Sequence, residues 1–282
     1  MDRKEARMKI KHAAQRALTG YRIPGSLLVV FSAAIIMFCF NFIKIYPPAA
    51  PFTLEQLSAM SNSELLQATV SMFVPDIITL AFLMRSGIVF LLLLLLVPAF
   101  NQGMRQYFCE VFHGQKPKIW VAFGWYADLG KLFGAIGLYL YIGLLVGLWF
   151  ILLIGIPTIV SAIAFALESV LLYFLSNLLL IAGIFFFALK LCSYSPAYYI
   201  HAANPQMGVL TAVKTSVKIT RGKLFEYLIF ELSFILWRLF VSLTEGLGEL
   251  LFTPYYYTAC TAFAEYLAIS SHVRETTLPE NE

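Results

Sequence analysis

Apolar residues form long runs, and short segments between them contain most of the charged residues. A helix needs about 20 apolar residues to cross a hydrocarbon core of about 30 Å. Six runs approach that length, and they predict spans over residues 23–42, 87–105, 133–153, 170–191, 225–243 and 253–269. The sixth is the weakest, because Pro254 opens it and Glu265 lies inside it. The pattern predicts an all-α, polytopic membrane protein with about six transmembrane helices.

The first apolar run bears on the domain organisation. It is too long for the core of a cleavable signal peptide, and no small-residue cleavage site follows it in register. We therefore expect it to be retained as the first span. The predicted parts are a basic cytoplasmic amphipathic segment over 1–22, a single six-span domain over 23–270 and a short polar cytoplasmic tail over 271–282.

Lys and Arg are distributed unevenly between the connections. Cations accumulate in cytoplasmic loops, so their positions predict orientation. The exceptions are Lys44 and Arg85, in opposite-side loops, and Arg238, inside the fifth run. The remaining 17 of the 20 cations fall on one side: Arg3, Lys4, Arg7, Lys9, Lys11, Arg16, Arg22, Arg105, Lys116, Lys118, Lys131, Lys190, Lys214, Lys218, Arg221, Lys223 and Arg274. Both termini are predicted to be cytoplasmic, with an even number of crossings.

Composition supports the membrane assignment. Hydrophobic residues make up 60% and charged residues 13%, against roughly 45–50% and about 25% in soluble domains. These fractions argue against a soluble enzyme, a disordered chain and a disulfide scaffold. The net charge of +4 belongs to the cytoplasmic face, where it fits anionic lipid headgroups. No nucleic-acid-binding motif accompanies it, so the expected partner is the bilayer, with other membrane proteins possible and nucleic acid excluded.

A basic amphipathic helix is predicted immediately before the fifth run. Asn204-Pro205 favours a helix start, and Gly222 favours its end. One predicted stripe is apolar, with Met207, Leu210, Val213 and Val217. The basic residues predicted to contact anionic lipid are Lys214, Lys218, Arg221 and Lys223. The N-terminal segment follows the same pattern, with an apolar face of Ala6, Ile10, Ala13 and Ala17.

Two predicted outer connections contain further elements. In the loop over 45–85, capping-box spacing at Thr53 with Gln56 and at Ser61 with Glu64 predicts short helices. Between the third and fourth runs, Pro157 precedes an apolar stretch over 158–167 that is too short to cross alone. We expect a re-entrant or interfacial segment there.

Several short motifs occur in an order that resembles a known family. They include Tyr198, Asn204-Pro205, Gly222-Lys223, Leu232-Ser233-Phe234-Ile235 with Trp237, and Pro254-Tyr255, preceded by Gly103 and Arg105. The chain resembles the bacterial integral membrane proteins catalogued as domain of unknown function 975. That resemblance implies a bacterial cell-membrane location and a six-span helical fold, with no assigned reaction, cofactor or catalytic residue. A fainter similarity is to the membrane domain fused to some glycerophosphodiester phosphodiesterases.

Residues typical of catalysis or metal binding are scattered. His12, His113, His201 and His272 have no paired-ligand spacing, and interfacial or solvated histidines are expected. The four cysteines are isolated, so free thiols are expected. The chain contains no P-loop, GxSxG or GxGxxG motif. We expect no catalytic residue, no metal site and no cofactor.

Small residues in the third run offer sites for close helix packing. Gly143 with Gly147, and Gly130 with Gly134, have GxxxG spacing. This spacing lets helix backbones approach one another. We expect packing within the chain rather than dimerisation.

Charges inside the apolar runs form the candidate polar site. Glu231 and Arg238 lie seven residues apart on nearly the same helical face, about 10 Å along the axis. They form either a polar seam for a substrate or ion, or two side chains that reach opposite interfaces or pair with neighbours such as Asn177 or Tyr255. Glu265 in the sixth run is a third candidate.

Three classes of function remain open, and for one of them, a membrane-embedded lipid-modifying enzyme, no residue gives positive evidence. The favoured one is a non-enzymatic scaffold, assembly factor or protective factor that binds other membrane proteins or lipids. The alternative is a small transporter or channel that uses the polar seam of the fifth span.

Overall fold

The structure is a computed structural model that describes residues 3–41 and 80–277. Every regular element in those two ranges is a helix, which confirms the all-α prediction. The capping boxes predicted over 53–64 lie outside the described residues.

The chain divides into two compact units. One comprises residues 1–31 and 98–282, and the other residues 32–97. Helices α2 (Arg22–Asn41) and α5 (Leu80–Phe112) each contribute to both units. Within the smaller unit, Cys39 and Val89 are buried. All the candidate site residues belong to the larger unit, which is described below.

Four helical segments are long and apolar enough to cross a membrane. They are Arg22–Cys39, Ser86–Phe112, Leu129–Ala166 and Val170–Ala203. Each overlaps one of the first four predicted spans, so the class of membrane-spanning helical protein is confirmed. The fifth run forms two short helices, α11 (Leu224–Leu232) and α12 (Ile235–Leu243), and the sixth lies within α13 (Glu249–Thr277). The count of six crossings stays a prediction.

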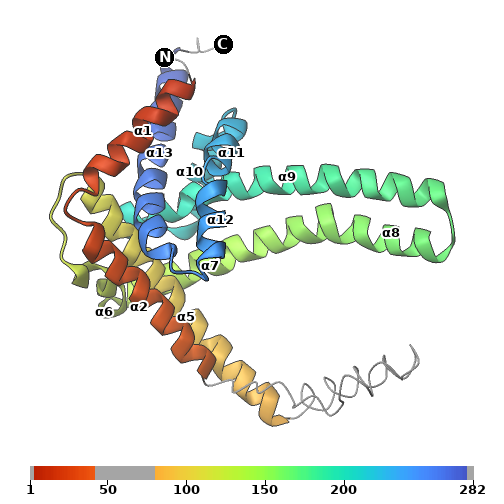
Figure 1. The fold of residues 1–282 in the computed structure, drawn as a ribbon, viewed down its shortest axis with the longest axis horizontal. Helices are drawn as coiled ribbons and strands as arrows, with labels where there is room; N and C mark the ends of the chain where they lie inside the picture. The colour runs from red at the N-terminus through yellow and green to blue at the C-terminus, as the bar shows by residue number, and fades with distance from the viewer. Residues whose placement is uncertain (1–2, 42–79, 278–282) are drawn as a thin grey trace. The chain divides into compact units, whose positions relative to one another are not determined.

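The third and fourth segments form a long antiparallel hairpin (Figure 1). Its first arm is continuous from α7 (Leu129–Phe150) through a π-helical stretch (Ile151–Gly155) into α8 (Ile156–Ala166). The returning arm is α9 (Val170–Ala203), which starts at the predicted residue and ends twelve residues beyond the predicted end at 191. The stretch over 158–167, where a re-entrant or interfacial segment was expected, therefore continues the helix of the third segment.

The π-helical stretch explains how the helix passes Pro157. Proline has no N–H, and its ring crowds the carbonyl four residues earlier, which here belongs to Leu153. A π-bulge changes the hydrogen-bond spacing locally and accommodates this defect. Gly183 on α9 faces the same carbonyl, and a Cβ atom at that position would lie 1.9 Å from the Leu153 oxygen. The neighbouring arm thus packs directly against the irregular turn.

The outer surface of the hairpin is apolar. Only 6% of the span window in the first arm and 11% of that in the second are buried. Contact between such a surface and water is unfavourable. Soluble proteins therefore rarely expose apolar patches of this extent. Lipid is the solvent that fits it.

Aromatic side chains form the largest core cluster, where α9, α11 and α13 meet. Phe230 stacks on Phe263 with ring centroids 4.2 Å apart. Tyr227 and Phe234 are buried beside them. The break between α11 and α12 therefore lies at one edge of a well-packed region.

Helix α1 (Arg3–Ala17) packs alongside α13 (Figure 1). The prediction of its apolar face is correct for Ala6, which is buried, but wrong for Ala13, which is exposed. Ala14 and Leu18 are buried instead. The contact stripe is thus rotated by one position, which adds Leu18 to the buried face.

Helix α10 (Val209–Thr220) begins five residues after the predicted start at Asn204. Its predicted apolar stripe is divided, because Val213 is buried while Leu210 and Val217 are exposed. The buried face instead includes Ser216, whose hydroxyl donates to the Ser193 carbonyl at 2.7 Å. That bond satisfies a polar side chain on the buried face, which the pattern of apolar residues did not assign to it.

The connection after α5 folds back onto it. It contains a 3₁₀ turn (Ile119–Phe123) and a short helix, α6 (Gly124–Ala127). A Cβ atom at Gly103 would lie 2.0 Å from the Ala122 carbonyl oxygen, so only glycine allows this approach. Trp125 is buried, and its indole N–H donates to Gln106 at 2.8 Å.

Candidate functional site

The candidate site begins at an interruption in the predicted fifth span. Helices α11 and α12 are separated by Ser233 and Phe234. The ammonium of Lys11, from α1, donates to the Ser233 hydroxyl at 2.6 Å and lies 4.4 Å from the centre of the Phe234 ring. Burial, and secondarily the nearby charge of Arg7, lowers the pKa of Lys11 below its usual value. The N-terminal helix is thus attached to the break by a partly buried cation.

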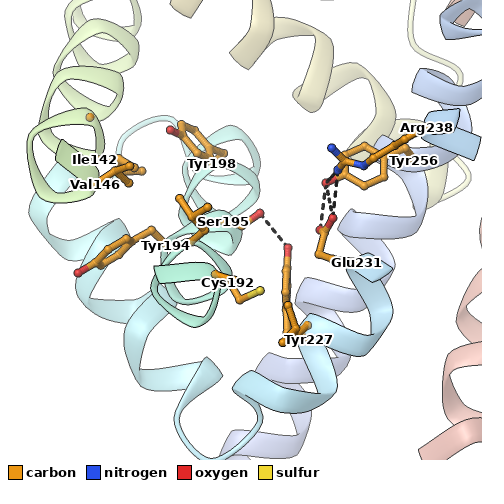
Figure 2. Close-up of a pocket in the computed structure, with 14 residues that line it drawn as sticks. Ile142, Val146, Cys192, Tyr194, Ser195, Tyr198, Tyr227, Glu231, Arg238 and Tyr256 are labelled. Atoms are coloured by element: carbon orange, nitrogen blue, oxygen red, sulfur yellow. Dashed lines mark hydrogen bonds and ion pairs between the residues drawn. The ribbon is translucent and has the colours of Figure 1, made fainter. Parts of the chain in front are cut away.

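Glu231 and Arg238 form an ion pair across this break. Arg238 Nη2 lies 3.3 Å from Glu231 Oε2. The Tyr256 hydroxyl lies 3.0 Å from both carboxylate oxygens and donates to the carboxylate. Figure 2 shows the three side chains grouped together, with Tyr256 contributed by α13.

The ion pair excludes the alternative in which the two side chains reach opposite interfaces. A continuous helix would separate the two residues by about 10 Å along its axis, and the break replaces that separation with direct contact. The pair is completed by Tyr256 rather than by the expected neighbours Asn177 or Tyr255, and Asn177 donates to Ser161 at 3.1 Å.

The two charged side chains differ in exposure. The Glu231 side chain is 19% exposed and the Arg238 side chain 56%. The carboxylate therefore faces the interior, while the guanidinium reaches the surface. Partial exposure lowers the desolvation cost that a fully buried pair would pay.

A cavity of about 500 Å³ lies beside the ion pair. Its walls come from α7, α9, α11, α12 and α13, and Figure 2 shows Ile142 and Val146 across from the charged group. Gly143 and Arg238 are exposed lining residues, so the cavity reaches the outside of the unit. The lining is mainly apolar: Ile142, Gly143, Val146, Ala188, Leu191, Cys192, Tyr194, Ser195, Tyr198, Tyr227, Leu228, Glu231, Arg238 and Tyr256.

The glycine pair on α7 has a different role from the one expected. A Cβ atom at Gly143 or Gly147 would meet nothing within 4 Å, so the predicted close packing of this pair within the chain is wrong. Gly143 lines the cavity instead. Of the second pair, Gly134 does face a neighbour, the His201 ring at 3.3 Å.

Arg105 lies among four tyrosine rings, which is a correction to its assignment as a loop cation. It belongs to α5, donates to the Tyr139 hydroxyl, and its guanidinium lies 4.6 Å from the Tyr198 ring centre and 5.1 Å from that of Tyr257. Tyr199 completes the group at 5.5 Å. The rings attract the cation through their faces. Arg105 therefore joins α5, α7, α9 and α13, and Tyr198 belongs both to this cluster and to the cavity wall.

Lys190 is a second cation that the sequence placed in a connection. It lies within α9, and its ammonium is 4.1 Å from the centre of the Trp149 ring on α7. Arg105 and Lys190 were thus both counted as loop residues, although they lie well inside long helices.

His201 is also placed differently from the prediction of a solvated histidine. It is 1% exposed, and its ring lies 5.5 Å from the Trp125 ring. Neither ring nitrogen has a hydrogen-bond partner among the described residues. No local signal in the sequence distinguishes this histidine from an interfacial one.

Glu265, the third candidate for the polar site, contacts other residues. Its Oε1 lies 2.6 Å from His113 Nε2, and both side chains are nearly half exposed. Glu265 lines a separate cavity of about 350 Å³ that contains Cys109 and Thr261. The structure thus brings Glu231 and Arg238 together and places Glu265 outside their cavity.

The four candidate lipid-contacting cations are in or just after α10. Lys214, Lys218 and Arg221 are exposed. Lys223 is partly buried, donates to the Ser270 hydroxyl and lies 4.5 Å from the Tyr266 ring centre. Three of the four side chains are therefore exposed, and the fourth contacts α13.

The described residues also define the state of the cysteines and possible metal ligands. All four cysteines are free thiols, as expected. Within residues 3–41 and 80–277, no group of three or more His, Cys, Asp or Glu side chains is positioned to hold a metal ion.

These features define a helical membrane protein with a lined cavity and an ion pair at a helix break. The chain matches a family described as protein of unknown function (DUF975) over residues 1–272, and it belongs to that family. No curated protein and no solved structure is a significant match to the chain. The similarity to the phosphodiesterase-linked membrane domain stays a prediction.

Proposed function

We propose that this protein is a non-enzymatic membrane protein that binds a membrane amphiphile in the cavity beside Glu231 and Arg238. The observation behind the proposal is the cavity itself, which has about 500 Å³ of space, mainly apolar walls and one pair of opposite charges among its few polar groups. Ligand sites commonly have volumes of about 300–1,000 Å³ with a few polar groups that orient the ligand.

The surroundings of the cavity favour an amphiphile over a water-soluble ligand. Leu140 and Leu144 are exposed on α7, and Leu236 and Leu239 are exposed on α12. In a bilayer these side chains contact acyl chains. A lipid can therefore enter laterally, with its chain against the apolar walls and its headgroup at the ion pair.

The proposal is tested by photo-crosslinking in lipid nanodiscs. A phospholipid with a diazirine in its acyl chain should label peptides from the cavity walls, and Ala188→Trp, which fills the cavity, should remove that labelling. Phe186→Trp is the matched control, because Phe186 is exposed on α9 and does not line the cavity. Labelling that is equal in both variants would contradict binding in the cavity.

The proposed setting is the cell membrane, with six crossings and both termini in the cytoplasm. The support is the uneven distribution of cations. Exposed Lys214, Lys218 and Arg221 would then contact anionic headgroups, each contributing about 1 kcal/mol near the surface. A fluorescent reporter that is active only in the cytoplasm, fused to each terminus in turn, tests the orientation.

A role as a scaffold, assembly factor or protective factor remains compatible with a bound amphiphile. Purification in mild detergent, followed by identification of bound proteins and lipids, distinguishes these roles. Recovery of lipid without a stoichiometric protein partner would favour lipid binding alone.

Transport is the second candidate function, and the helix break favours it. Discontinuous helices with polar groups at the interruption are typical of substrate sites in transporters. The pair Glu231 and Arg238 lies at such an interruption. Substrate-dependent flux in proteoliposomes that Glu231→Gln abolishes would favour transport over binding alone.

A further inference from the structure

The cavity presents both signs of charge at one point, and this restricts the headgroup of its ligand. We infer, on the basis of the proposed function, that the ligand is an amphiphile whose zwitterionic headgroup combines a primary ammonium with a phosphate diester. The ammonium would bind Glu231, and the phosphate would bind Arg238.

The net neutrality of the pair favours a zwitterion. A purely anionic headgroup would gain Arg238 but would lie beside the carboxylate of Glu231, 3.3 Å away. A purely cationic headgroup would gain Glu231 but would lie beside the guanidinium of Arg238. A zwitterion gives each protein charge an opposite partner and adds no net charge to the neutral pair.

Both side chains have unused hydrogen-bonding capacity. The Glu231 carboxylate offers about four lone-pair sites, and its described contacts are with Tyr256, Arg238 and Tyr227. Arg238 has five N–H donors, and one nitrogen, Nη2, makes both of its described hydrogen bonds. The carboxylate can therefore accept from an ammonium, while the free edge of the guanidinium can bind two phosphate oxygens.

The type of ammonium matters because of the acceptors that face it. A primary ammonium has three N–H donors, and hydrogen bonds between charged groups are about twice as strong as neutral ones. A quaternary ammonium has no donor. It gains mainly from aromatic faces, and two tyrosine rings of the cavity wall already face arginines: Tyr256 lies 5.4 Å from the Arg238 guanidinium and Tyr198 lies 4.6 Å from that of Arg105. The site is thus suited to a phosphoethanolamine-type headgroup rather than a phosphocholine-type one.

The two charges are placed for a single headgroup. Glu231 faces inward from the last turn of α11, and Arg238 reaches the surface from the first turn of α12. In a phosphoethanolamine headgroup, two carbons and an ester oxygen separate the charged atoms. One molecule can therefore contact both residues while its chain extends along Ile142 and Val146.

The experiment uses the same diazirine acyl chain on phosphoethanolamine, phosphocholine and phosphoglycerol headgroups, in nanodiscs that contain the full chain. We expect the wild-type cavity to be labelled about five- to ten-fold more by the ethanolamine probe than by either other probe, as one additional charge-assisted contact implies. Stepwise N-methylation of the ethanolamine probe should reduce labelling in the wild type, so this arm requires no variant.

Two variants assign the charges. Glu231→Gln should reduce the ethanolamine-to-glycerol ratio to about one, while Arg238→Gln should lower labelling by all three probes. Glu168→Gln, at the exposed tip of the hairpin, and Lys214→Gln on α10 are the controls, and they should match the wild type.

The outcomes separate this inference from the proposed function. Cavity labelling that is equal for the three headgroups would overturn the headgroup assignment and leave amphiphile binding in place. Labelling restricted to exposed surfaces such as Phe186 would overturn both. A preference for phosphoglycerol would show that Arg238 alone selects an anionic ligand, and it would also overturn the assignment.

Discussion

Gly183 and Gly147 provide a direct test of the packing between the two arms of the hairpin. An added Cβ at Gly183 would lie 1.9 Å from the Leu153 oxygen, where ordinary contact begins at 3.4 Å. The two backbones would have to separate by roughly 1.5 Å. Overpacking of this kind costs about 1–3 kcal/mol, and replacing a helical glycine by alanine recovers up to about 1 kcal/mol.

The expected net effect of Gly183→Ala is a loss of about 1–2 kcal/mol, which corresponds to a decrease in Tm of several degrees for a chain of this size. Gly147→Ala is the matched control in the same hairpin, because its added Cβ meets nothing within 4 Å. It should leave Tm unchanged or raise it. Thermal unfolding in one detergent, followed by intrinsic fluorescence, gives both values. An equal or higher Tm for Gly183→Ala would refute the close approach of α9 to the π-helical stretch.

Three further predictions concern the irregular and polar features. Lys11→Met removes a hydrogen bond to Ser233 and a cation–π contact, so it should lower stability by about 1–2 kcal/mol and speed proteolysis of α1; unchanged cleavage would contradict the attachment. Arg105→Lys loses the planar guanidinium that the tyrosines surround, whereas Tyr139→Phe removes a single hydrogen bond. Arg105→Lys should therefore lower Tm by more than Tyr139→Phe. The reverse order would refute the role of Arg105 in joining the four helices. Pro157→Ala restores the missing N–H and should stabilise the helix of the first arm. The measurement is amide hydrogen exchange around residue 153, which should become slower. Faster exchange there would argue against the proline as the cause of the π-helical stretch.

The long spans could be predicted because their signal is local. Val170 was correctly identified as the start of α9, since an uninterrupted apolar run begins there after Glu168 and Ser169. The periodicity and length of an apolar run were sufficient to predict a helix where that helix is continuous and its outer surface faces lipid.

Two interruptions were mispredicted for opposite reasons. Pro157 is a strong local breaking signal, but a π-helical stretch packed against Gly183 accommodates it. Ser233 and Phe234 carry no such signal, yet the helix stops there. Phe234 is buried against Phe252 and Tyr256, and Lys11 binds Ser233 from another helix. Tertiary contacts determine the second interruption, so local pattern could not reveal it.

The polar site was identified in part. Glu231 and Arg238 were identified because charges inside an apolar run are costly and often functional. Their direct contact depends on the break, and Tyr256 comes from a distant segment. Arg105 was missed because counting cations by loop treats every arginine near a span end as solvated, although tyrosines from α7, α9 and α13 surround it.

The most direct test of amphiphile binding is native mass spectrometry of the wild type, Ala188→Trp and Phe186→Trp, each released from the same lipid nanodiscs. Binding in the cavity beside Glu231 predicts one retained lipid per wild-type and per Phe186→Trp molecule, and loss of that lipid in Ala188→Trp. Identical lipid adducts on all three proteins, or none on the wild type, would contradict the claim that the cavity is a lipid-binding site.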